Sequence, residues 1–286
     1  MILFFFPPYN GISLQRNQLA ALIFSIKKRT VRVVRGSKKL NQEDDFMKKV
    51  GLCRILSLLT LCLFFIQSTV LAADSLITTD DLKKKIDAGE PLTLIDALSS
   101  IEHNEMAIAG SINIPSSKVA GNPLLPADKA SLLIFYCKGP KCTKSKKAAD
   151  AATALGYTNV MVYNEGLPAW AKKGYPIENK VKYPNVDLPR LNPADVQAQA
   201  GGIVMLDIRG EEVIEVGKIK GAVNIPLDDL DEKYTTLPKD KKIVIIDHAG
   251  KQVGVCGKFL HMNGYTDLAV MDGGVLAWKR AGLPVE

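Results

Sequence analysis

The sequence is poor in the residue types that build metal centres and disulfide frameworks. Its 286 residues include only 5 cysteines and 3 histidines. The cysteines are Cys53, Cys62, Cys137, Cys142 and Cys256. A chain of this size can fold without disulfides. Two cysteines with no nearby histidine or third cysteine make a poor zinc set, and His103 and His248 stand isolated. We therefore expect no metal ion and no cofactor.

The chain also lacks a surplus of positive charge after residue 73. The net charge is +7, but residues 1–73 hold 11 of the 37 basic and 3 of the 30 acidic residues. The remainder carries 26 basic and 27 acidic residues. Because the basic character belongs to the leading segment, we expect no nucleic-acid partner. A hydrophobic content of 47% and a length of 286 residues are typical of a globular protein with two domains.

The apolar run at residues 55–66 is shorter than the roughly 20 residues of a membrane-spanning helix. It fits a secretory signal peptide over residues 47–73, which starts at Met47 with two lysines behind it. Residues 55–66 form its apolar centre, and small residues favour cleavage after Ala72 or Ala73. We expect a periplasmic or secreted protein that meets the membrane only through this segment. An uncleaved anchor is the alternative.

Residues 1–46 fit neither a signal nor a domain. An apolar start, a Pro-Pro pair and a basic stretch follow one another without a regular pattern. We interpret them as a non-native extension, with Met47 as the true start. N-terminal sequencing of the native protein tests this interpretation, and a detected precursor that carries residues 1–46 would contradict it.

The rest of the chain is an internal repeat. At an offset of 111 residues, matching positions are Asp96 and Asp207, Gly110 and Gly221, and Asn113-Ile114-Pro115 and Asn224-Ile225-Pro226. At an offset of 108, they are Gly156-Tyr157-Thr158 and Gly264-Tyr265-Thr266, Trp170 and Trp278, and Pro176 and Pro284. Two copies of about 100 residues indicate duplicated domains, which we place at residues 74–178 and 190–286 with a linker at 179–189.

Each copy alternates strands with helices. The expected strands are 92–96, 131–136 and 160–163 in the first copy and 203–207, 242–246 and 268–271 in the second. Capped helices begin near Thr79 and Asn192, and each copy ends in a short helix that carries a tryptophan. This α/β pattern predicts a parallel sheet covered on both faces. Trp170 and Trp278 are expected to pack in the cores.

Cys137 is the strongest candidate for chemistry. It ends a buried strand and precedes a loop that leads into a helix, where free backbone amides and the helix dipole stabilise a thiolate. Lys138, Lys141 and Lys144 add positive charge beside it. The place suits a nucleophilic sulfur or a bound anion. The alternative is a buried and inert cysteine.

The combined pattern resembles the rhodanese-like (sulfurtransferase) family in tandem. The motifs that carry the resemblance are Asp96, 109–115, Cys137 and 164–170 in the first copy, and 206–209, 217–226 and 271–278 in the second. The resemblance implies two tandem domains with about five parallel strands each. It implies that Cys137 takes a sulfane sulfur from a small anionic donor such as thiosulfate and passes the sulfur to a thiophilic acceptor, for example a protein thiol. The implied binding residues are Lys138, Gly139, Lys141, Cys142, Thr143, Lys144 and Ser145.

Departures from the family pattern separate the two copies. Asp247 stands where the second copy should have its cysteine, so we expect that copy to be inactive, with Cys256 as a core residue. The first copy has a loop two residues longer, with Lys144 in the place of the usual arginine. Without an arginine fork, a phosphatase or arsenate reductase is disfavoured. No arginine follows Asp96, which puts the support of the loop in question.

Cys142 lies inside that longer loop and leaves three roles open. It could be a resolving thiol for Cys137, a partner in a resting disulfide, or a small filler. Two alternatives to a turnover sulfurtransferase follow. The protein could be a persulfide carrier for a partner protein, or a thiol–disulfide redox protein that uses both cysteines.

Overall fold

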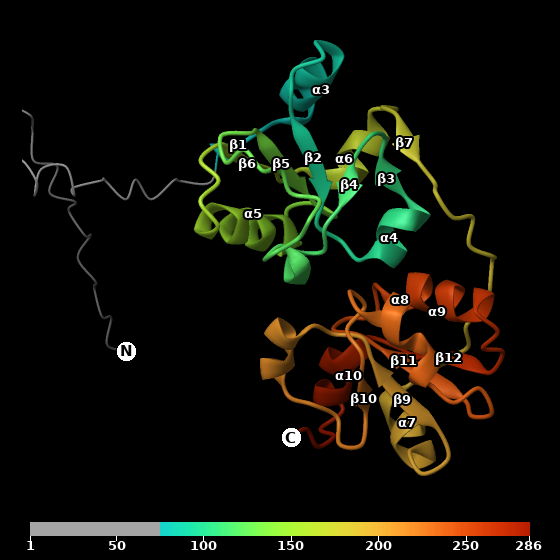
Figure 1. The fold of residues 1–286 in the computed structure, drawn as a ribbon. Helices are drawn as coiled ribbons and strands as arrows, with labels where there is room; N and C mark the ends of the chain where they lie inside the picture. Colours follow the sequence, from blue (N-terminus) through green and yellow to red (C-terminus); the bar gives the residue numbers. More distant parts are fainter. Residues whose placement is uncertain (1–74) are drawn as a thin grey trace, which may run out of the picture. The chain divides into compact units, whose positions relative to one another are not determined.

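Two five-stranded parallel sheets, one for each copy, form the framework (Figure 1). The computed structural model describes residues 75–286, so the expected extension, signal peptide and cleavage site lie outside the described residues. The first sheet has the order β1 (Ser75–Leu76), β6 (Val160–Tyr163), β5 (Leu133–Tyr136), β2 (Thr93–Asp96) and β4 (Ile112–Asn113). The second has the order β8 (Arg190–Leu191), β12 (Leu268–Met271), β11 (Ile243–Ile246), β9 (Val204–Asp207) and β10 (Val223–Asn224). All pairs in both sheets are parallel, as expected.

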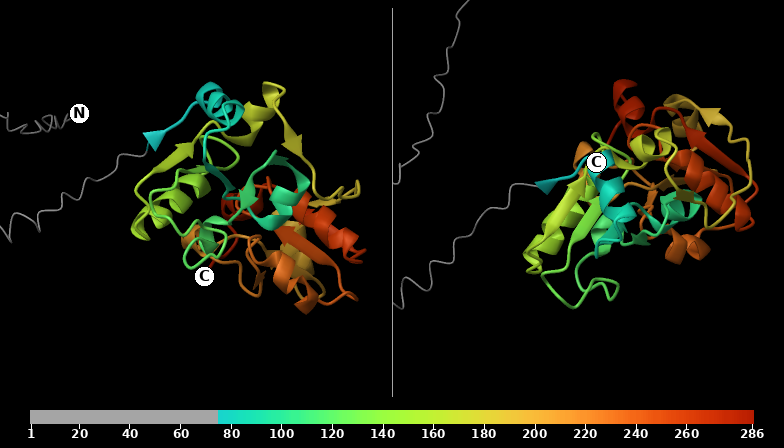
Figure 2. Two further views of the ribbon diagram at one scale, coloured as in Figure 1. Left: turned by 45° about the horizontal axis from the view of Figure 1, so that its top comes forward. Right: turned by 90° about the horizontal axis from the view of Figure 1, so that it is seen from above.

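Helices lie on both faces of each sheet (Figure 2). In the first copy they are α3 (Thr79–Asp87), α4 (Ser100–Glu105), the 3-10 turn η1 (Ser116–Lys118), α5 (Lys144–Ala154) and α6 (Gly166–Lys172). In the second they are α7 (Pro193–Gln199), η2 (Glu211–Val216), α8 (Leu230–Lys233), η3 (Tyr234–Thr236), α9 (Val253–Met262) and α10 (Gly274–Arg280). A short antiparallel pair, β3 (Ala107–Ile108) and β7 (Ile177–Glu178), completes the first copy.

Side-chain alternation along β5 divides the first core into two layers. Leu133 and Phe135 pack with the small residues of α5, among them Ala148. Ile134 and Tyr136 point to the other face, where they pack with α3 and α6. Period-two alternation on a sheet covered on both sides gives a continuous apolar strand. Cys137 follows this strand at its carboxyl end.

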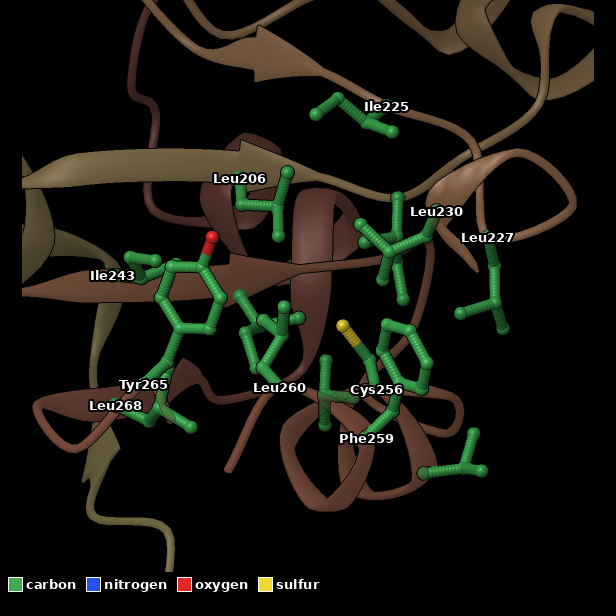
Figure 3. Packing of buried hydrophobic residues seen from close by; sticks show 14 of the residues in the cluster. Leu206, Ile225, Leu227, Leu230, Ile243, Cys256, Phe259, Leu260, Tyr265 and Leu268 are labelled. Carbon is green, nitrogen blue, oxygen red and sulfur yellow. The ribbon is translucent and has the colours of Figure 1, made fainter. Parts of the chain in front are cut away.

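The second copy repeats this division along β11, because Ile243 and Ile245 belong to one cluster and Val244 and Ile246 to the other. Figure 3 shows part of the first of these clusters. Cys256 on α9 is fully buried beside Leu206 and Phe259, which confirms its expected place in the core. Trp170 and Trp278 are also buried, as predicted, and each indole N–H donates to a proline carbonyl six residues further on. Ile101 of α4 belongs to the first copy, yet it packs into this core of the second.

The repeated Asn-Ile-Pro motif fixes the segment beside the strand-ending acid. The amide nitrogen of Asn113 donates to the carbonyls of Asp96 and Leu98 at 3.0 and 2.9 Å. Asn224 makes the equivalent pair of bonds at 2.8 and 2.9 Å in the second copy. A side-chain amide satisfies two buried carbonyls at a chain crossing. This explains why asparagine recurs at the same offset as the acid.

Among residues 75–286, no helix is both long enough and apolar enough to cross a membrane.

Candidate active site

Cys137 lies directly after the central strand β5 and is 1% exposed. Its carbonyl accepts the backbone N–H of Leu167 at 2.9 Å. Gly166 (φ +70°) approaches so closely that a Cβ there would lie 2.4 Å from the Cys137 carbonyl oxygen. Only glycine fits this contact without strain. The start of α6 therefore holds the base of the Cys137 loop against the sheet.

The loop turns back at once into α5. The N–H of Cys142 donates to the carbonyl of Gly139 at 2.8 Å, which closes a tight turn. Gly139 has φ +111°, a value that favours glycine. Helix α5 begins at Lys144, after the exposed residue Thr143. The hydroxyl of Ser145 lies 3.2 Å from the sulfur of Cys137. The predicted strand–loop–helix arrangement is therefore present, with Ser145 in the first turn of the helix.

This surrounding stabilises the thiolate of Cys137. A hydrogen bond from Cys142 is the largest influence and lowers the pKa of Cys137, while burial acts in the opposite direction. The hydroxyl and N–H of Ser145 and the N–H of Gly139 add to the lowering, and the pKa falls to about 6. A sulfur with this pKa is ionised at neutral pH and can act as a nucleophile.

Cys142 is the protonated partner in this pair. Its hydrogen bond to Cys137, together with burial, raises the pKa of its thiol far above the usual value. The backbone amides of Lys144 and Lys138 also interact with its sulfur. Cys137, Cys142 and Cys256 are all free thiols. The sulfur of Cys137 also lies 3.3 Å from the carbonyl oxygen of Cys142. The longer loop thus brings Cys142 against Cys137.

Two of the three loop lysines already have carboxylate partners. The ammonium of Lys138 lies 2.7 Å from Glu102 of α4, whose side chain is 1% exposed. Lys144 lies 2.5 Å from Asp228 of the second copy. Burial would raise the pKa of Glu102, but Lys138 and Lys144 outweigh it and keep that pKa below its ordinary value. Lys141 is exposed on the loop. An anionic donor at Lys138 or Lys144 would therefore compete with carboxylates of the protein.

Glu102 joins the loops of both copies, and the sequence pattern gave little sign of this role. One carboxylate oxygen accepts from Lys138, and the amide of Gln252 donates to the same oxygen at 3.3 Å. The other accepts from Ser99 in a capping box, a signal that is visible in the sequence as Ser-x-x-Glu. Gln252 thus reaches from the second copy to a carboxylate of the first.

His103 is not isolated, contrary to the expectation from sequence. Its Nδ1 lies 3.0 Å from the carboxylate of Asp96, and its Nε2 lies 3.0 Å from the ammonium of Lys180. In the second copy, Arg209 binds the matching acid Asp207 through both Nε and Nη2. The missing arginine of the first copy is therefore replaced by a histidine from the next helix. A buried acid needs such a partner, and His103 supplies it to Asp96.

Asp247 fills the loop of the second copy. Its carboxylate accepts the N–H groups of Gly250, Lys251 and Gln252, the last two at 2.7 and 2.6 Å. These amides are the ones that would otherwise face an anion in the loop. Asp247 lies directly after β11, as Cys137 lies after β5. The carboxylate of Asp247 thus accepts the N–H groups of this loop. A carboxylate cannot carry a sulfane sulfur.

Among residues 75–286, no group of three or more histidine, cysteine, aspartate or glutamate side chains is placed to hold a metal ion. The buried pair of His103 and Asp96 interacts with Lys180 and lies in the protein interior.

Comparisons with known proteins point to one family. A family model for a rhodanese-like domain matches residues 78–173 and again residues 192–281. A sulfurtransferase of Allochromatium vinosum is 30% identical over 88 residues, which cover 31% of this chain and 82% of that protein.

Two solved structures are similar to parts of the chain. A rhodanese-related protein of Thermoplasma volcanium is 30% identical, with 34% of this chain and 97% of that chain covered and a TM-score of 0.33. A thiosulfate sulfurtransferase of Pseudomonas aeruginosa is 22% identical, with 74% and 43% covered and a TM-score of 0.35. The two family matches coincide with the two copies that the sheets define, and so the chain belongs to the rhodanese-like family, with two such domains in tandem.

Proposed function

We propose that the protein is a sulfurtransferase in which Cys137 carries the transferred sulfur as a persulfide. The observation that carries the proposal is the position of Cys137 before α5, with the Ser145 hydroxyl 3.2 Å from its sulfur and a pKa lowered to about 6 by its hydrogen-bond partners. Membership of a family with sulfurtransferase relatives supports the same chemistry.

The reaction proceeds in two displacements. The Cys137 thiolate attacks the outer sulfur of a donor such as thiosulfate, a sulfur–sulfur bond forms, and sulfite leaves with the electron pair of the broken bond. A thiophilic acceptor, for example a protein thiolate, then attacks the outer sulfur of the persulfide. The Cys137 thiolate leaves and is regenerated, so no external oxidant or reductant is needed. Loop amides stabilise the anionic outer sulfur.

The test is the intact mass of the reduced protein before and after incubation with thiosulfate. We expect a gain of one sulfur atom that disappears in Cys137→Ser and persists in Cys256→Ala. An unchanged mass would overturn the proposed persulfide. A stable persulfide that forms without turnover by cyanide or small thiols would identify a carrier that serves a partner protein.

A second candidate rests on the contact between Cys137 and Cys142. In this reaction Cys137 attacks the disulfide of an oxidising partner, Cys142 loses its proton and resolves the mixed disulfide, and the partner leaves as a dithiol. Cys142→Ser would abolish this cycle and leave sulfur transfer largely intact. A loss of two hydrogens that needs Cys142, in place of a gain of sulfur, would favour the redox function.

We also propose that residues 47–73 are a cleaved signal peptide and that the protein works in the periplasm or outside the cell. N-terminal sequencing of the native protein tests this, with a start just after Ala72 or Ala73 as the expected result.

A further inference from the structure

Asp228 of the second copy lies against the Cys137 loop of the first. One carboxylate oxygen lies 2.5 Å from the ammonium of Lys144, and the other accepts the hydroxyl of Ser117 at 3.0 Å. The side chains of Lys144 and Asp228 are only 17% and 10% exposed. Two residues of one copy therefore hold a shielded carboxylate of the other. An ion pair with so little solvent around it is screened weakly.

Lys144 supplies a positive charge at the start of the helix that follows the Cys137 loop. It is the first residue of α5 and directly precedes Ser145, whose hydroxyl lies 3.2 Å from the Cys137 sulfur. Its charge also helps to lower the pKa of Glu102. An anion that approaches Cys137 would gain from this charge, but Asp228 already compensates it.

The contacts around this ion pair are mostly polar. Lys118 pairs with Glu232 at 2.8 Å, and Lys258 pairs with Glu105 at 2.8 Å. The hydroxyl of Ser100 donates to Asp231 at 2.5 Å. Polar contacts between domains permit relative motion more readily than a large apolar interface does. Ile101 adds an apolar contact between the copies, so the polar contacts around Asp228 are one part of the interface.

We propose that Asp228 is a specificity-determining residue of the Cys137 site, because it withholds the charge of Lys144 from incoming anions. An anionic reagent must compete with the carboxylate of Asp228, whereas a neutral reagent of the same size pays no such penalty. The consequence for anionic sulfur donors rests on the proposed function. The charge discrimination itself does not.

The test compares alkylation of Cys137 by iodoacetate, which is anionic, and iodoacetamide, which is neutral. The same thiolate attacks both reagents and displaces iodide from each, so the ratio of their rates reports the local charge. Asp228→Asn should raise the ratio of iodoacetate to iodoacetamide rates roughly three- to tenfold. Glu232→Gln is the matched control, because it removes the same charge from the same face of the second copy. That variant should leave the ratio within about twofold of the wild-type ratio.

A second variant tests the route through Lys144. Lys144→Gln should lower the ratio, because it leaves the carboxylate of Asp228 uncompensated. Adding Asp228→Asn to that variant should return the ratio to about the wild-type value and not above it. An unchanged ratio in Asp228→Asn, or an equal rise in Glu232→Gln, would overturn the proposal. Cys256 reports folding, because it stays unlabelled while the second core is intact. If Asp228→Asn exposes Cys256, Ser117→Ala loosens the same carboxylate from its other oxygen and should give a smaller rise.

Alkylation does not require sulfur transfer, so the two proposals fail separately. A shifted ratio without persulfide formation would remove the proposed function and retain the role of Asp228. Persulfide formation with an unchanged ratio would do the reverse.

Discussion

Cys137 and Asp247 occupy equivalent places at the carboxyl ends of the two central strands. The Cys137 carbonyl accepts the N–H of Leu167, and the Asp247 carbonyl accepts the N–H of Val275, both at 2.9 Å. The backbone of the site is therefore kept in both copies, while the group that faces the loop amides differs. In the second copy a carboxylate already satisfies those amides.

Asp247→Cys should place a reactive thiol in the second loop. The amides of Gly250, Lys251 and Gln252 would then face a sulfur in place of a carboxylate, and they favour its thiolate form. In a Cys137→Ser, Cys142→Ser background, we expect iodoacetamide to label one thiol rapidly at pH 7. Asp247→Ser in the same background is the matched control and should show no such labelling. A thiol that reacts with iodoacetamide as slowly as a free cysteine does would contradict the expectation.

The reactivity of Cys137 should depend on pH with a midpoint near its pKa of about 6. The thiolate is the reactive form, so alkylation is fast above this pH and falls as the pH drops through it. Cys142→Ala removes the strongest lowering contact and should move the midpoint upward by roughly one unit. Cys256→Ala, far from the loop in the second core, should leave the midpoint unchanged. Iodoacetamide rates measured from about pH 4 to about pH 9, a range that includes both a midpoint near 6 and the ordinary thiol pKa of about 8.5, check both expectations.

Gly166→Ala and Gly174→Ala form a matched pair. Both glycines have nearly the same φ, +70° and +71°, but a Cβ at Gly174 would meet nothing within 4 Å. Gly174→Ala should therefore cost only the left-handed backbone penalty of about 1 kcal/mol. Gly166→Ala adds a clash with the Cys137 carbonyl and should cost about 2–4 kcal/mol. Urea unfolding measures the difference, and the Cys137 labelling rate should fall only in Gly166→Ala.

His103→Ala should destabilise the protein by about 1–3 kcal/mol, because it leaves the buried Asp96 without its nearest partner. Arg209→Ala removes the matching partner in the second copy and should cost more, about 3–5 kcal/mol, because a buried ion pair is broken. His261→Ala, on an exposed residue of α9, is the control and should stay within about 0.5 kcal/mol of the wild type. Equal free energies of unfolding for His103→Ala and His261→Ala would contradict the role given to His103.

Local patterns predicted most of the framework. Strand ends at Asp96 and Asp207, the third strand of each copy and the helix starts at Thr79 and Asn192 agree with the structure. The expected strands 131–136 and 242–246 begin at Leu133 and Ile243 instead. A strand begins only where a neighbouring strand is present to share its backbone hydrogen bonds. The hydrophobic pattern of the sequence does not show where that point lies.

The site was predictable only where its parts are adjacent in sequence. Cys137 and Ser145 are joined by one short loop, so the resemblance to the family pattern was enough to pair them. Glu102 and Asp228 come from other elements, and nothing in the repeat offset indicates that they pair with Lys138 and Lys144. The substitution of His103 for an arginine was missed because it lies on the next helix, where only the fold brings it to Asp96.

Ile101 of the first copy is buried only after the second copy has been synthesised. The ribosome completes the first copy before the second exists, and domains fold largely in the order in which they are made. The side chain of Ile101, 1% exposed in the finished protein, is covered by core residues of the second copy. Until those residues are translated, the nascent first copy leaves Ile101 uncovered, next to Glu102, which pairs with Lys138. The second copy therefore completes the burial of an apolar side chain of the first.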